Sequence, residues 1–153
     1  MEAQAPITND EQQKLIKLFD YIKEVDQTYT TQGMQCFEKI FEIAPEALQL
    51  YPFRDEKGDE YIKKLKKHAS GLFMKLDYAA RNWGNGECEK NLNDLGSRHV
   101  NYSVIEPHFE IVGMAITETL HDLLKAKFTA EYQELWKKFF LSVCYKMQKG
   151  NFW

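Results

Sequence analysis

The chain has 153 residues, of which 44% are hydrophobic, and its 20 basic and 23 acidic residues give a formal net charge of −3. This length suits one domain, residues 1–153, with a core large enough to fold without a disulfide framework. The balanced charge excludes a general polyanion binder, so we expect no nucleic-acid partner. No apolar run approaches the roughly 20 residues of a membrane span, and the polar start shows no signal peptide, so we expect a cytoplasmic protein.

The first half of the chain shows two helices and a loop, after a short extension over residues 1–7 that we expect to be disordered. Residues 8–26 form the first predicted helix, with Thr8 as N-cap and Glu11 completing a capping box. A second helix begins near Gly33 and ends before Pro45, because the residue before a proline is unfavourable in a helix. Residues 46–59 hold a short helical turn and then a loop.

The sequence of the second half of the chain predicts four more helices. A long helix covers residues 60–83 and ends at two glycines, and a shorter one covers residues 89–100. Pro107 suits the first turn of the next helix, where its missing N–H has no partner in any case. Thr129 caps a last helix with an apolar stripe that runs to Met147. Since no alternating strand pattern occurs, the sequence predicts an all-α fold of six or seven unequal helices.

Two of the four histidines interrupt apolar helix faces. His68 lies three residues after Leu65 and four before Leu72, and residues three and four apart share a helix face. His99 lies four residues after Leu95 in the same way. Both imidazoles are therefore expected to point inward. By contrast, we expect His121 on the surface and His108 at a partly buried position.

An inward imidazole needs a partner, and two interpretations stay open on the residues alone. Each ring could donate to a backbone carbonyl or a tyrosine hydroxyl as an ordinary core group. Imidazole is also the commonest metal ligand and the usual axial ligand of haem iron. No Asp, Glu or Cys joins the two histidines on their stripes, which argues against a protein-ligated zinc site. A planar cofactor that brings four ligands of its own needs only one or two histidines and apolar walls.

Four segments resemble the globin family in the correct order and spacing. The proximal-histidine signature of globins, Leu-Gly-x-x-His with Val five residues later, is similar to LGSRHVNYSV. The helix with the distal histidine resembles KKLKKHASGLF, and its histidine lies 31 residues before the proximal one. The second and final globin helices resemble FEKIFEIAPEAL and FTAEYQELWKKFFLSVCYKMQKG. The resemblance covers about residues 8–150 of the chain.

This resemblance implies a globin fold of six to eight helices with a haem b pocket between the helices that carry His68 and His99. His99 would be the proximal iron ligand and His68 the distal one, and Lys67 or Arg98 could reach a haem propionate. The other residues that the resemblance assigns to the haem pocket are Phe37, Tyr51, Phe53, Leu72, Leu95, Val104, Phe109 and Val112.

Within the family, the pocket resembles neuroglobins more than oxygen-storage myoglobins, because Phe37 matches the phenylalanine on their distal side. A neuroglobin-like pocket implies six-coordinate iron with His68 bound in the ligand-free state. It also implies reversible binding of oxygen, carbon monoxide and nitric oxide, in a monomer or weak dimer that serves sensing or redox roles. Nitric oxide dioxygenation, which needs a reductase partner, or nitrite reduction would be a side activity. Two alternatives stay open: a five-coordinate storage protein, and a globin-shaped sensor or interaction module without haem.

Two features depart from the family pattern. Globins nearly always place phenylalanine six residues after the proline that corresponds to Pro45, but this chain has Tyr51 there. Either Tyr51 packs against the porphyrin, bringing a hydroxyl that needs a partner, or the loop shifts to use Phe53. The 22 residues between Pro45 and His68 also make a shorter loop than in neuroglobins. That loop has no cysteine, so it cannot form the disulfide of some neuroglobins; the three cysteines are Cys36, Cys88 and Cys144.

Overall fold

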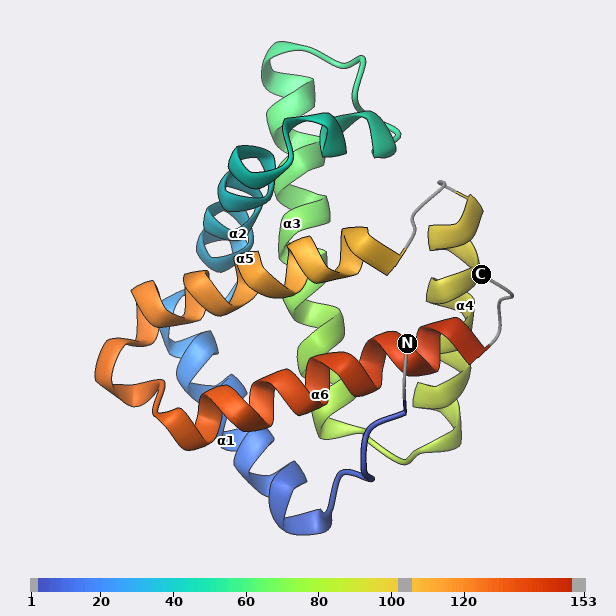
Figure 1. The fold of residues 1–153 in the computed structure, drawn as a ribbon. Coiled ribbons are helices and arrows are strands. Elements are labelled where there is room, and N and C mark those ends of the chain that lie inside the picture. Colours follow the sequence, from blue (N-terminus) through green and yellow to red (C-terminus); the bar gives the residue numbers. More distant parts are fainter. Residues whose placement is uncertain (1–2, 102–105, 150–153) are drawn as a thin grey trace.

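A computed structural model describes residues 3–101 and 106–149 of the chain. The described residues form six α-helices and two short 3-10 helices (Figure 1) and include no strand, which confirms the all-α prediction. In chain order the elements are α1 (Asn9–Val25), α2 (Thr30–Ile43), η1 (Pro45–Leu50), α3 (Gly58–Arg81), α4 (Gly86–Asn101), α5 (Glu106–Leu124), η2 (Lys125–Lys127) and α6 (Ala130–Lys149). Within these ranges no helix combines the length and apolar character needed to cross a membrane.

Side chains cap the N-termini of α1 and α4. The Thr8 hydroxyl accepts from the backbone N–H of Glu11 at 3.1 Å, and the Glu11 carboxylate accepts from that of Thr8 at 3.0 Å. The predicted capping box of α1 is therefore confirmed. Helix α4 begins three residues earlier than the sequence predicted, because the Asn85 side-chain oxygen accepts from the N–H of Glu87 at 2.8 Å. This cap at Asn85 was not among the helix signals predicted from the sequence.

Helices α2 and α3 approach each other closely at Gly33. A Cβ atom at this position would lie only 2.4 Å from the backbone carbon and oxygen of Ala69 in α3. Only glycine permits this separation, since any larger residue would overlap the backbone of the other helix. The close crossing brings Phe37, one turn after Gly33, against His68, with 5.5 Å between their ring centroids. The backbone of α2 thus fixes one wall around His68.

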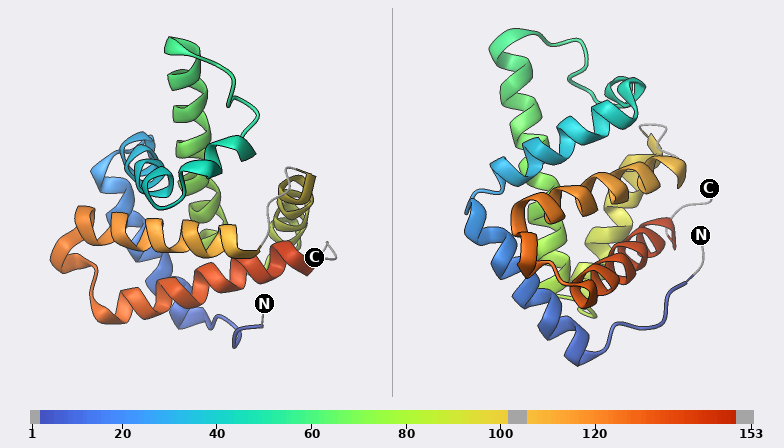
Figure 2. Two further views of the ribbon diagram at one scale, coloured as in Figure 1. Left: turned by 45° about the horizontal axis from the view of Figure 1, so that its top comes forward. Right: turned by 60° about the vertical axis from the view of Figure 1, so that its left-hand side comes forward.

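Aromatic side chains fill the core between α1 and α6. The Phe19 ring meets the rings of Phe139 and Trp136 edge to face, with centroids 6.0 and 6.5 Å apart. Such pairs add stability beyond the burial of their surface. Figures 1 and 2 show α5 and α6 side by side across α3, with α4 beside the C-terminal half of α6. All three cysteines are buried, and none forms a disulfide within the described residues.

A polar network that runs from the core to the surface joins α1, the start of α2 and the end of α3. The Tyr29 hydroxyl donates to the Asp77 carboxylate, which also accepts from Arg81 one turn later. Arg81 donates in addition to Asp20 of α1 at 2.7 Å. Asp77 is buried and Arg81 reaches the surface, so the buried carboxylate has both a hydroxyl and a guanidinium partner and is not left unpaired. The network lies away from the two inward histidines and stabilises the frame around them.

Candidate functional site

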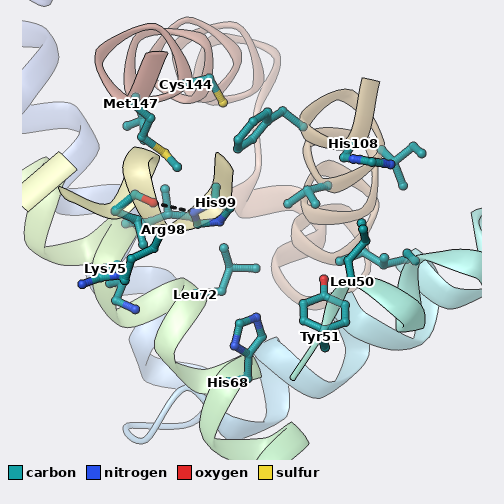
Figure 3. Close-up of a pocket in the computed structure, with 18 of the residues that line it drawn as sticks. Leu50, Tyr51, His68, Leu72, Lys75, Arg98, His99, His108, Cys144 and Met147 are labelled. Atoms are coloured by element: carbon teal, nitrogen blue, oxygen red, sulfur yellow. Dashed lines mark hydrogen bonds between the residues drawn. The ribbon is translucent and has the colours of Figure 1, made fainter. Parts of the chain in front are cut away.

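A cavity of about 320 Å³ lies among α2, η1 and helices α3 to α6 (Figure 3). This volume falls within the roughly 300–1,000 Å³ range of small-molecule and cofactor pockets. Its walls are mainly aliphatic and aromatic side chains. Among the described residues, the lining side chains with polar or charged groups other than sulfur are Tyr51, His68, Lys75, Arg98, His99 and His108. A mostly apolar cavity with a few convergent polar groups is typical of a ligand site.

His99 reaches the cavity from the last turn of α4, and a backbone hydrogen bond fixes its orientation. Its Nδ1 lies 2.7 Å from the carbonyl oxygen of Leu95, one turn earlier. A carbonyl oxygen can only accept, so Nδ1 carries the proton and Nε2 keeps its lone pair. The ring packs against Phe109, with 5.7 Å between centroids, and burial lowers the pKa of His99. A neutral histidine held in this way is ready to bind a metal through Nε2.

His68 reaches the cavity from α3 through a ring of aromatic neighbours. Its centroid lies 4.9 Å from that of Tyr51, 5.5 Å from that of Phe37 and 5.8 Å from that of Phe53. The imidazole borders the open cavity, and it makes no hydrogen bond within the described part of the chain. His68 is still exposed to solvent, and the partial removal of its ring from water, followed by the positive charge of Lys75, lowers the pKa of His68 to about 4. The ring is therefore neutral at physiological pH, with a nitrogen available to a ligand.

The two histidines enter the cavity from different helices and from opposite sides. Figure 3 shows the His68 ring pointing in from α3 and the His99 ring pointing in from α4, with Leu72 also directed into the space. Two neutral imidazoles facing one apolar cavity form a nitrogen donor set suited to an iron that needs only axial ligands. The described residues offer no cluster of three or more His, Cys, Asp or Glu side chains for a metal bound by protein alone. The donor set therefore fits a haem.

Most of the residues that the sequence assigned to the pocket line this cavity: Phe37, Tyr51, Leu72, Leu95, Phe109 and Val112. Phe53 does not line it. Its ring stacks behind that of Tyr51, with centroids 5.5 Å apart and planes 18° apart, and it packs against Tyr61. Of the two alternatives for this position, Tyr51 is the one that faces the cavity. Val104 lies outside the described residues.

Several residues of the cavity wall were not predicted from the sequence. Lys75 follows His68 by seven residues, or two helical turns, so the helical period could have placed it on the same face. Lys67, suggested from the sequence as a partner of a propionate, is exposed and does not line the cavity. The final helix contributes a stripe with the spacing i, i+3, i+4, i+7, which consists of Phe140, Val143, Cys144 and Met147.

Two cations lie on the cavity wall close to the histidines. Lys75 of α3 and Arg98 of α4 both line the cavity, and neither forms an ion pair with an acidic side chain in the described ranges. Burial lowers the pKa of Lys75, and the charge of Arg98 lowers it further. Two neighbouring cations without acidic partners favour a ligand that carries carboxylates. The propionates of a haem have this chemistry.

Comparisons with known proteins agree with the geometry. The family model described as Globin matches residues 34–147. An anaerobic nitrite reductase of Gossypium hirsutum is 36% identical over 110 residues, which is 68% of this chain and 68% of that protein. One of Casuarina glauca is 33% identical over 110 residues, covering 68% of this chain and 69% of the relative.

A solved structure extends the likeness to nearly the whole chain. The crystal structure of a hexacoordinated heme protein from an anhydrobiotic tardigrade, at pH 4, matches with a TM-score of 0.77. The match covers 95% of each chain at 18% sequence identity, so it shows a shared fold. Together with the family match, it confirms the resemblance predicted from the histidine motifs. The chain belongs to the globin family, and this membership implies a haem group.

Proposed function

We propose that this globin binds one haem b, with His99 as the proximal and His68 as the distal iron ligand, and that it binds diatomic gases reversibly. The observation that carries the proposal is the 2.7 Å hydrogen bond from His99 Nδ1–H to the carbonyl of Leu95. This bond leaves Nε2 free on the wall of an apolar cavity that His68 also lines.

Haem iron, when bound, supplies a coordination position for oxygen, carbon monoxide or nitric oxide. The chain's own residues supply the rest. Leu95 and Phe109 hold the His99 ring, and the aliphatic and aromatic walls would limit the contact of water with a bound haem. Lys75 and Arg98 provide the positive charge that neutralises the propionates.

The surroundings of His68 favour six-coordinate iron in the ligand-free state. The ring is neutral, has no hydrogen-bond partner within the described residues, and is held among Phe37, Tyr51 and Phe53. A neutral imidazole without a partner gains more by binding a metal than one already engaged with the protein. A gas must then displace His68. The apparent affinity of the protein for the gas is therefore the intrinsic affinity multiplied by the fraction of protein in which His68 is not bound to iron. Such a pocket suits oxygen or nitric oxide sensing, or redox roles, more than bulk storage.

Nitrite reduction is a second candidate function, because both plant relatives are named as anaerobic nitrite reductases. Conversion of nitrite to nitric oxide and water consumes one electron and two protons, so it needs an external electron donor. Tyr51, and His68 when it is not bound to iron, are groups on the cavity wall that can donate a hydrogen bond to nitrite. Nitric oxide release from nitrite by the chemically reduced, oxygen-free protein tests this activity, and no release above that of free haem would exclude it.

Titration of the haem-free protein with haem tests the main proposal. We expect an intense Soret band that saturates at one haem per chain and moves when carbon monoxide is added to the reduced protein. A globin-shaped interaction module without haem would show no saturable band even with excess haem. His121→Ala is a suitable control variant, because His121 is exposed and does not line the cavity.

A further inference from the structure

Tyr51 presents its aromatic ring in a fixed position on the cavity wall. The ring stacks on Phe53, with centroids 5.5 Å apart, and meets Phe37 edge to face at 5.6 Å. The His68 ring lies 4.9 Å away at a steep interplanar angle of 70°. Contacts on several sides restrict the rotation of the Tyr51 ring and therefore fix the direction of its hydroxyl. Tyr51 and His68 thus share one end of the cavity.

The Tyr51 hydroxyl points into this cavity without a partner. Figure 3 shows its oxygen pointing into the cavity, between the walls formed by α3 and α5. No hydrogen bond joins this oxygen to any residue described in the structure. Burial raises the pKa of Tyr51 well above its ordinary value, so the oxygen keeps its proton. This O–H group is a donor on the cavity wall without an acceptor among the described residues, so a polar ligand in the cavity can accept its hydrogen bond.

We propose that Tyr51 is a second hydrogen-bond donor on the distal side, which stabilises polar diatomic ligands in the cavity and discriminates oxygen from carbon monoxide. The inference rests on the proposed function, since it needs a ligand held at the iron between the two histidines. Oxygen gains negative charge when it binds ferrous haem, whereas carbon monoxide stays nearly neutral, so a donor favours oxygen. The His68 nitrogen is engaged in the six-coordinate state, whereas the Tyr51 donor is positioned before any ligand arrives.

Two pairs of variants test the proposal on the haem-loaded protein: Tyr51→Phe in the natural chain and in a His68→Leu background. Removing only the hydroxyl keeps the ring contacts, and the His68→Leu background removes the other donor on the distal side. We expect the C–O stretching frequency of the ferrous carbon monoxide complex to rise in both pairs. The rate of oxygen dissociation should increase roughly three- to tenfold, which corresponds to the free energy of one hydrogen bond. The rate of carbon monoxide dissociation should change less than about twofold.

Tyr61→Phe is the matched control. Its ring contacts Phe53, with 5.9 Å between centroids, but it does not line the cavity. Loss of its hydroxyl should leave the C–O frequency and both dissociation rates unchanged, with haem content equal to that of the natural protein. A similar response to Tyr61→Phe would overturn the assignment to Tyr51, because it would report a general disturbance of the loop.

The remaining outcomes separate this inference from the proposed function. If the natural protein takes up no haem, the proposed function fails. If haem and carbon monoxide bind normally but the two proteins in the His68→Leu pair share one C–O frequency and one oxygen dissociation rate, only the inference about Tyr51 is wrong. Tyr51→Phe could also change only the fraction of iron bound to His68. That result would overturn the inference about Tyr51 too, since Tyr51 would then position His68 without contacting the ligand.

Discussion

The Nδ1–H of His99 donates to the carbonyl oxygen of Leu95, 2.7 Å away and one turn earlier on the same helix. This bond selects the tautomer whose Nε2 can bind a metal, and it restrains the plane of the ring. Both partners belong to α4, so the ligand is oriented by the secondary structure that carries it. The orientation therefore does not depend on the cofactor.

Replacing His99 with glycine should abolish tight haem binding. We expect affinity to fall by more than about 100-fold, since loss of a supporting partner alone costs 10- to 100-fold. Added imidazole should restore the spectrum, because the space left by the side chain accepts a free ring. Absorption titrations with and without imidazole measure this effect. Stoichiometric haem with an unchanged spectrum, in the absence of imidazole, would show that His99 is not the proximal ligand.

Replacing His68 with leucine should open the distal side of the iron. In the natural protein, the rate of carbon monoxide binding should level off at high concentration, because dissociation of His68 becomes limiting. In the variant this rate should rise linearly with concentration, and bound oxygen should leave up to about tenfold faster as a hydrogen bond is lost. Stopped-flow mixing measures both rates. A natural protein whose binding rate never levels off would argue against coordination by His68.

Gly33→Ala should destabilise the protein far more than Gly71→Ala, although both glycines lie in helices. A Cβ at position 33 would lie 2.4 Å from the backbone of Ala69, whereas one at position 71 meets nothing within 4 Å. We expect Gly33→Ala to lower the free energy of unfolding by about 3 kcal/mol. Gly71→Ala should raise it by about 0.5–1 kcal/mol through helix propensity. Urea denaturation of the two variants checks the difference, and equal effects would contradict the close crossing.

Much of the site could be predicted from helical periodicity. The period of 3.6 residues placed His68 and His99 on inward faces, and the same period at seven residues could have found Lys75. A loop has no regular period, so periodicity could not predict whether Tyr51 or Phe53 faces the cavity. That choice depends on the path of the chain after η1. The Tyr29–Asp77 pair, 48 residues apart, also gives no local signal. Long-range polar pairs are therefore the part of this fold that sequence patterns could not supply.

The haem-free protein should lose stability as the pH falls from about 6.5 towards 4. His68 has a pKa of about 4 in the folded chain, against about 6.5 for an unperturbed histidine. Between these values the unfolded chain takes up a proton that the folded chain does not, so acid favours unfolding. Urea midpoints at pH 7 and pH 5 measure the effect, and His68→Leu should reduce it. An equal pH dependence in both proteins would exclude His68 as its source.

The absorption spectrum of the ferrous, ligand-free protein tests the central claim most directly, because it reports both axial ligands at once. If His68 and His99 both bind the iron, the reduced protein should show two sharp visible bands of six-coordinate, low-spin haem. The His68→Leu variant should show one broad band of five-coordinate haem. A single broad band in the natural protein would contradict the bis-histidine site, and the absence of any haem band after reconstitution would contradict the proposed function itself.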